Sequence, residues 1–207
     1  MREKQLYYIF GLLLILFTSC GRTTKTEYFP NGEKKSEINY SGEKLDGASD
    51  YFYNNGHLQS HFFYKDGLLE GESQSFFFSG DTETKCLYKN GKLNGVYQIF
   101  FSDGNILKEI KHYKNDTLEG KYIAYYRNGE IKIEGSYKSN MFDSTWNYYD
   151  RYGRLVGKGI FKKGNGTLES YHKNGNISQI TPYIENEIVG EEKYFNNDGK
   201  LIKTVDY

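Results

Sequence analysis

Short runs of aromatic and aliphatic residues recur along this chain, and each run ends at a turn that contains glycine. The stretch from Tyr88 to Gly104 shows the pattern: an Asn-Gly turn, an aromatic-rich run at 96–101 and a closing Ser-Asp-Gly. The closing glycine recurs at intervals of 22 to 25 residues, as Gly32, Gly56, Gly80, Gly104, Gly129, Gly153, Gly175 and Gly199. Self-similarity at a nearly fixed period predicts a repeat array, in which each unit contacts only its neighbours.

Two apolar columns flank these glycines. The residue four positions before the glycine is aromatic in every unit: Tyr28, Phe52, Phe76, Phe100, Tyr125, Tyr149, Tyr171 and Phe195. The residue two positions after it is apolar in six units: Leu58, Ile106, Ile131, Leu155, Ile177 and Leu201. In a three-residue hairpin loop these two positions pair on one face, whereas a two-residue loop places them on opposite faces. We therefore expect hairpins with a type I turn and a bulge at a left-handed glycine, and both columns on the buried face.

A third aromatic column follows eight or nine residues after the glycine: Tyr40, Tyr64, Tyr88, Tyr113, Tyr137, Phe161, Tyr183 and Tyr207. A longer connection, as at 89–94, then leads into the next hairpin. One unit buries too little apolar surface to offset the entropy lost on ordering its backbone, so neighbouring units must stack. The sequence thus predicts an all-β fold: an elongated, twisted antiparallel sheet of about eight tandem β-hairpin repeats over residues 28–207.

The first twenty residues lack this pattern. Arg2 and Lys4 precede a mainly apolar segment at 7–17, and Thr18-Ser19 leads to Cys20, which is the layout of a secretory signal peptide. The apolar segment is shorter than the roughly 20 residues that a membrane-spanning helix needs. A cysteine directly after small residues resembles the lipobox of bacterial lipoproteins, in which the thiol carries a diacylglycerol and becomes the mature N-terminus.

We therefore expect a lipoprotein signal peptide at 1–19, a lipidated Cys20 with a polar linker over 20–27, and a location at the cell envelope. Gly21 is not the aspartate that retains many Gram-negative lipoproteins in the inner membrane. The outer membrane is thus the expected destination, with the side of that membrane left open. An ordinary signal peptide with an incidental Cys20 is the alternative.

The composition favours a folded protein without obvious chemistry. The 27 basic and 27 acidic residues cancel, which gives no electrostatic signature of nucleic-acid binding. The four histidines occupy different columns, no pair of carboxylates recurs, and the glycine turns do not match phosphate-binding motifs. We expect no enzyme activity, catalytic residue, metal, cofactor or small-molecule substrate. The expected partners are the membrane, through the N-terminal lipid, and a protein of unknown identity.

Extra aromatic residues stand seven and five positions before several glycines, on the face opposite the column four positions before. Tyr97, Tyr122 and Trp146 recur at 25 and 24 residues, so they should align across three adjacent hairpins, with Tyr148 beside them. Either a long sheet packs aromatic residues on both faces, or this row is an exposed surface that a partner covers. We take these four residues as the candidate partner-binding site, in preference to the aromatic column that follows the glycines.

The runs at 88–95 (Tyr-Lys-Asn-Gly-Lys-Leu-Asn-Gly) and 100–106 (Phe-Phe-Ser-Asp-Gly-Asn-Ile) resemble the bacterial variant of the MORN repeat, also known as the YwqK-like antitoxin family. The resemblance covers residues 28–207. It implies a sheet of hairpins that serves as a scaffold for protein or phospholipid contacts, and it supplies no catalytic residue. The alternative function is an antitoxin or immunity-type inhibitor that neutralises a toxin or enzyme, although a lipoprotein leaves the cytoplasm where a classical toxin would act.

The lipoprotein hypothesis predicts a covalent modification at Cys20. Metabolic labelling with a palmitate analogue should tag the protein, and Cys20→Ala should abolish the label because the acylated thiol is lost. Equal labelling of the parent and the variant would contradict the hypothesis.

Overall fold

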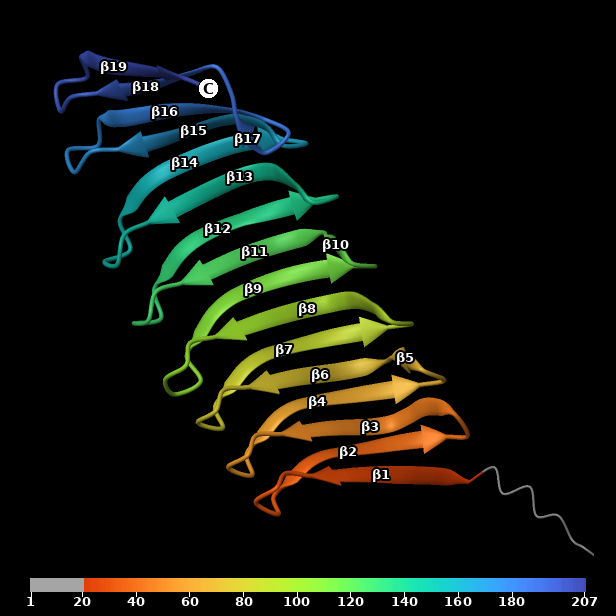
Figure 1. Cartoon of the computed structure of the whole chain (residues 1–207). Coiled ribbons are helices and arrows are strands. Elements are labelled where there is room, and N and C mark those ends of the chain that lie inside the picture. Colours follow the sequence, from red (N-terminus) through yellow and green to blue (C-terminus); the bar gives the residue numbers. More distant parts are fainter. Residues whose placement is uncertain (1–20) are drawn as a thin grey trace, which may run out of the picture.

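The computed structural model describes residues 21–207, which form one long antiparallel sheet and no helix. Neighbouring strands along the chain pair with each other from end to end, so the described sheet is a meander in a single layer. Figure 1 shows the strands side by side, twisting gradually from β1 to β19. The predicted all-β fold, an elongated twisted sheet of tandem hairpins, is confirmed. The signal peptide predicted at 1–19 and the lipidated Cys20 lie outside the described residues.

The first half of the sheet comprises β1 (Arg22–Tyr28), β2 (Lys34–Ser41), β3 (Lys44–Phe52), β4 (Leu58–Lys65), β5 (Leu68–Leu69), β6 (Gly71–Phe76), β7 (Thr82–Lys89), β8 (Lys92–Phe100) and β9 (Leu107–Lys114). The second half comprises β10 (Thr117–Leu118), β11 (Gly120–Tyr125), β12 (Ile131–Lys138), β13 (Met141–Tyr149), β14 (Leu155–Lys162), β15 (Asn165–Tyr171), β16 (Ile177–Ile184), β17 (Glu187–Ile188), β18 (Glu191–Phe195) and β19 (Leu201–Asp206). The short strands β5, β10 and β17 directly precede β6, β11 and β18, and each such pair occupies one place in the sheet. Among the described residues there is no helix of the length and apolarity needed to cross a bilayer.

The glycine turns have the predicted geometry. At the second turn, the Tyr53 N–H donates to the His57 carbonyl at 2.8 Å, and the Gly56 N–H donates to the Tyr53 carbonyl at 3.0 Å. These bonds define a three-residue loop, a type I turn followed by a left-handed bulge residue. The same two bonds recur at six other turns, and the φ angles of all eight closing glycines lie between +78° and +93°. The expected pairing across the turn is also present, for example Phe52 opposite Leu58.

The fourth turn is one residue longer than the others. The Phe101 N–H donates to the Ile106 carbonyl at 2.8 Å, and Asn105 adopts a φ of 55° after Gly104. Phe100 therefore pairs with Leu107, and the predicted place of Ile106 in the apolar column is wrong. The extra residue of the 25-residue unit lies within the turn, where it leaves the ladder of hydrogen bonds intact.

The connections between hairpins are tighter than predicted. Lys89 pairs with Lys92, which leaves a two-residue loop, and Asn90 and Gly91 have φ angles of 50° and 77°. Two consecutive positive φ angles are typical of a type I′ turn, which matches the twist of the flanking strands. The longer connection expected at 89–94 is therefore wrong, because residues from Lys92 onward already belong to β8.

The array also begins earlier than predicted. Residues 22–27 were expected to form a polar linker, but they form most of β1, which pairs with β2 from Arg22 opposite Ser41 to Tyr28 opposite Lys34. Tyr28 is the last residue before the first turn, and a hairpin needs the strand that leads into that turn. The repeat array therefore starts at Arg22 and not at Tyr28.

The two faces of the sheet are not buried as predicted. Side chains alternate along a strand, so Tyr97 and Phe100 of β8 point to opposite faces. The buried apolar side chains of residues 21–207 lie on the face that carries Tyr97 and the column after the glycines, here named the tyrosine face; they are Cys86, Ala124, Trp146 and Phe161. Phe100 and most of its column are only half-buried. Their predicted role as the buried core is wrong, because the tyrosine face carries two rows of large side chains in the middle hairpins.

Trp146 lies at the centre of the tyrosine face. Its ring stacks on Tyr122 with centroids 5.5 Å apart, and it makes edge contacts with Tyr137 at 5.0 Å and Phe142 at 4.7 Å. A Cβ atom added at Gly135 would lie 2.2 Å from an indole carbon. The indole therefore lies flat on the backbone of Gly135. The neighbouring rings cover the indole, a role that a second sheet or a helix has in a two-layer protein.

This packing predicts unequal costs for two aromatic truncations. Trp146→Ala should lower the free energy of unfolding by about 3–5 kcal/mol, because it opens a cavity among the rings. Tyr152→Ala removes a ring that is 83 % exposed and should change the stability by no more than about 0.5 kcal/mol. Urea denaturation followed by circular dichroism measures both. Similar losses would show that the core has been assigned to the wrong residues.

Candidate binding surface

The predicted aromatic row is aligned but not exposed. Tyr97 pairs with Lys111, Tyr122 pairs with Gly135, and the Tyr122 ring stacks on Trp146. The row shares its face with the column that follows the glycines, because the centroids of Tyr122 and Tyr137 lie only 5.8 Å apart. The expectation of a separate exposed surface is therefore wrong. Partner binding by the four predicted residues stays a prediction, but Trp146, at 2 % exposure, has almost no surface to offer.

The three tyrosines of this row are half-buried. Burial raises the pKa of Tyr148 to about 12, and it also raises the pKa values of Tyr97 and Tyr122. The phenols therefore stay neutral at physiological pH, as expected of rings that contribute packing.

The edge of the sheet that holds the glycine turns, here named the turn edge, is tied together by asparagines. Four residues that precede a glycine each donate from Nδ2 to a backbone carbonyl 23 residues further on, at 2.8 to 3.1 Å: Asn31, Asn55, Asn128 and Asn174. The Oδ1 atom of each of these side chains accepts the N–H of the residue after its glycine. One asparagine thus closes its own turn and fixes the next turn beside it.

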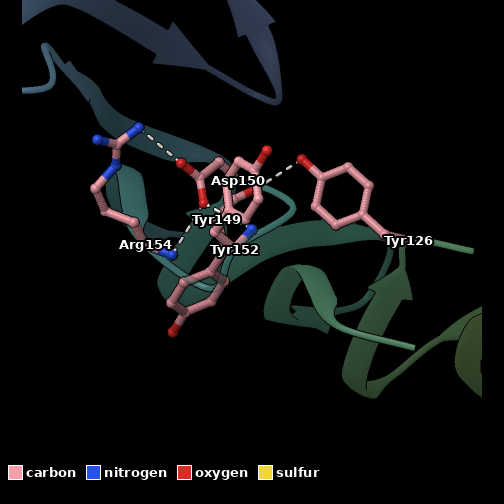
Figure 2. A network of polar contacts seen from close by, with 5 residues as sticks. All are labelled: Tyr126, Tyr149, Asp150, Tyr152 and Arg154. Carbon is pink, nitrogen blue, oxygen red and sulfur yellow. Dashed lines mark hydrogen bonds and ion pairs between the residues drawn. The ribbon is translucent and has the colours of Figure 1, made fainter. Parts of the chain in front are cut away.

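The sixth turn departs from this rule, because Tyr152 takes the place of the asparagine. Asp150 closes the turn instead: its Oδ1 accepts the N–H groups of Tyr152 at 3.0 Å and Arg154 at 3.1 Å, and its Oδ2 accepts the Arg154 guanidinium at 2.7 Å. Tyr126 of the preceding unit donates from its hydroxyl to the Tyr149 carbonyl at 2.8 Å. Figure 2 shows this network, with the Tyr152 ring pointing away from the Asp150–Arg154 pair. Because Asp150 closes the turn, the side chain of Tyr152 is not needed to hold the turn in its conformation.

Basic side chains lie over the aromatic rings of the fourth, fifth and sixth turns. Lys108 and Arg127 lie 5.9 and 4.7 Å from the centroid of Phe101. Lys132 lies 5.8 Å from the centroid of Tyr126, and Arg151 lies 5.8 Å from that of Tyr152. Such contacts orient a cation without neutralising it. We name this surface the turn patch; its members are Lys108, Tyr126, Arg127, Lys132, Arg151 and Tyr152.

Two adjoining hollows lie within the turn patch. One of about 290 Å³ is lined by Lys108, Lys132 and the rings beside them, and one of about 400 Å³ is lined by Asn128 and Arg151. Tyr126 and Arg127 line both hollows. The acidic residue of the lining is Glu109, which pairs with Lys111 at 2.8 Å. The hollows therefore carry an excess of positive charge, and they suit an anionic ligand held by charge and hydrogen bonds.

Comparison with protein families identifies the hairpins. The sequence profile of the MORN repeat variant matches residues 24–41, 45–66, 93–115, 118–139, 165–185 and 188–207, which together make up more than half of the chain. The chain belongs to the MORN repeat variant family. No curated protein matches the chain in sequence.

Two further hairpins of the array lie outside the matched segments. The hairpins around Gly80, formed by β6 and β7, and around Gly153, formed by β13 and β14, have the same hydrogen-bonded turn as the matched units. The described residues thus contain eight hairpin repeats, and the family profile matches six of them. The unit around Gly153 is also the one in which Tyr152 precedes the glycine and Asp150 closes the turn.

Sequence reasoning missed the turn patch. A signal was present: three of the four arginines in residues 21–207 are Arg127, Arg151 and Arg154, on two neighbouring turns of the MORN array. Arg127 and Arg151 each stand two positions before the closing glycine, and each is adjacent to a tyrosine. The net charge of the whole chain concealed this local excess.

A separate polar cluster lies on the tyrosine face of the last MORN unit. Glu192, at 3 % exposure, accepts hydrogen bonds from Tyr194 at 2.6 Å, Thr181 at 2.7 Å and Tyr207 at 3.3 Å. The bond from Tyr194, assisted by those from Thr181, Gln179 and Tyr207, lowers the pKa of Glu192 although desolvation opposes the shift. The same bond raises the pKa of Tyr194 to about 12. These hydrogen bonds satisfy the Glu192 carboxylate, so its role is to stabilise the fold.

The Glu192 cluster predicts an acid-sensitive contribution to stability. The folded-state pKa lies below the unfolded value of about 4.3, so the carboxylate stabilises the fold above that value and this contribution is lost as the pH falls through the folded-state pKa. Urea midpoints should therefore fall less steeply between about pH 5 and pH 3 in Glu192→Gln than in the parent. The exposed Glu130→Gln is the matched control and should keep the parental profile. Identical profiles for all three proteins would contradict the assignment.

Proposed function

We propose that this protein is a non-enzymatic scaffold of the bacterial cell envelope, which holds a protein partner on its MORN sheet and is anchored by a lipid on Cys20. The supporting observation is the single-layer sheet, which presents its faces and its turn edge along eight units. Apolar side chains are exposed on the face opposite the tyrosine face, among them Phe63 at 44 % and Ile160 at 64 %. Repeat sheets of this kind suit extended contacts with a partner.

Polar side chains between the units accept hydrogen bonds from the backbone of the turns. Because they are used in this way, they support a binding role for the protein more than a catalytic one. Glu70 accepts the backbone N–H of Asn90 at 2.7 Å, and Glu119 accepts that of Ser139 at 2.8 Å. These carboxylates hold one unit against the next along the edge opposite the turn edge. They therefore have a structural role that does not require acid–base chemistry.

The proposed anchor is supported by the sequence around Cys20 and by the start of β1. The first strand begins at Arg22, two residues after Cys20. A lipid on Cys20 would therefore hold the first MORN unit at the membrane surface, and the other units would extend from it. Because Gly21 follows the cysteine, the outer membrane is the proposed location.

Site-specific photo-crosslinking in cells tests the scaffold role. A photoreactive residue at position 63 or 160 should yield an adduct of defined mass in the membrane fraction, because both positions are exposed on the proposed scaffold. The same probe in the Cys20→Ala protein should lose both the membrane association and the adduct. Absence of an adduct from both positions would contradict the scaffold role. An adduct with a cytoplasmic protein would instead favour the inhibitor function.

A further inference from the structure

We propose that the turn patch binds an extended acidic segment of a partner protein, whose carboxylates stand three residues apart. The proposal rests on the scaffold role proposed above and specifies the chemistry of the partner at one place on the sheet. Three features support it: the local charge, the spacing of two arginines, and an exposed aromatic ring that the fold does not need.

The charge of the patch is available to a ligand. Arg151 makes none of the ion pairs found within residues 21–207, and its guanidinium lies over the Tyr152 ring. Arg127 pairs with Asp103, but both side chains are more than half exposed, and an ion pair in water stabilises a fold only slightly. A ligand carboxylate can therefore replace Asp103 at little cost. The planar guanidinium can hold such a carboxylate through two parallel hydrogen bonds.

The spacing of the arginines matches an extended chain. Arg127 and Arg151 occupy equivalent positions in neighbouring units, and two steps of about 4.8 Å between strands separate such positions by about 9.6 Å. A peptide in the extended polyproline II conformation advances about 3.1 Å per residue with three residues per turn, so residues three apart lie on the same side and about 9.3 Å apart. Acidic residues at positions i and i+3 of a chain bound in this conformation would therefore meet both guanidinium groups.

The rings of the patch provide an apolar contact between the charges. Tyr126 lines both hollows, and Tyr152 is exposed because Asp150 closes its turn. Tyrosine and arginine are among the side chains enriched at the hot spots of protein interfaces. The cations follow one row of turns and alternate with rings, which suits a linear chain better than the plane of charges on a membrane surface.

Fluorescence anisotropy with the full-length protein in detergent tests this proposal. The probe is a labelled nine-residue peptide with glutamate at every third position, and the control peptide carries glutamine at those positions. The parent should bind the glutamate peptide, and R127Q/R151Q should bind it about tenfold more weakly. K173Q/K200Q removes the same charge from exposed side chains on the seventh and eighth turns, and it should bind within about twofold of the parent.

Several results would overturn the proposal. These are equal weakening in both double variants, equal binding of the glutamine peptide, and no binding of the glutamate peptide to the parent. Vesicles of phosphatidylcholine and phosphatidylglycerol form a further arm: binding of these vesicles that depends on Arg127 and Arg151, without binding of the peptide, would assign the patch to lipid. Crosslinking at positions 63 and 160 separates the two proposals. If R127Q/R151Q still forms the crosslinked adduct but the parent does not bind the glutamate peptide, the scaffold role stands and only the proposal of an acidic ligand is contradicted.

Discussion

The structure depends on one constraint: a single-layer sheet has no second layer to cover its side chains. Every large ring must then be covered by side chains of neighbouring strands and by the backbone beneath it. Trp146 shows the solution, since its indole lies on Gly135 and is enclosed by Tyr122, Tyr137 and Phe142. A unit taken out of the array would lose the rings of the two adjacent units that cover its own side chains. Stability is therefore a property of adjacent units, as expected for a one-dimensional repeat.

The same constraint explains where the repeat length varies. The 25-residue unit places its extra residue in the loop at Asn105, which leaves strand pairing unchanged. The 22-residue interval before Gly175 has a different origin: β14 and β15 pair without a shift of register from Gly157 to Lys162, whereas β2 and β3 contain a bulge between Ile38 and Tyr40. Length thus changes only at turns and bulges, where the backbone hydrogen bonds between units can be preserved.

The sequence predicted those features that one unit determines by itself. The columns on either side of the glycine could specify a three-residue loop, because pairing across a hairpin depends only on local register. Which face is buried depends on contacts between several units. The column that contains Phe100 could not show that Trp146 and the rings around it pack closely on the other face. The strand at 22–27 was missed because its polar side chains give no apolar pattern. The turn patch was missed because its residues belong to three units.

The sixth turn shows how a repeat can acquire a specific surface without losing its fold. Asparagine before the glycine has two structural tasks, closure of its turn and attachment to the next turn, so its replacement would ordinarily weaken both. Asp150 provides the closure from two positions earlier, so the sixth turn keeps its conformation without an asparagine. The Tyr126 hydroxyl and the Asn128 amide attach this turn to the preceding one. Position 152 is thereby released, and it carries an exposed ring beside Arg151. The remaining turns with asparagine lack this freedom. An exposed ring can therefore stand beside a cation at the turn where Asp150 has taken over the closure.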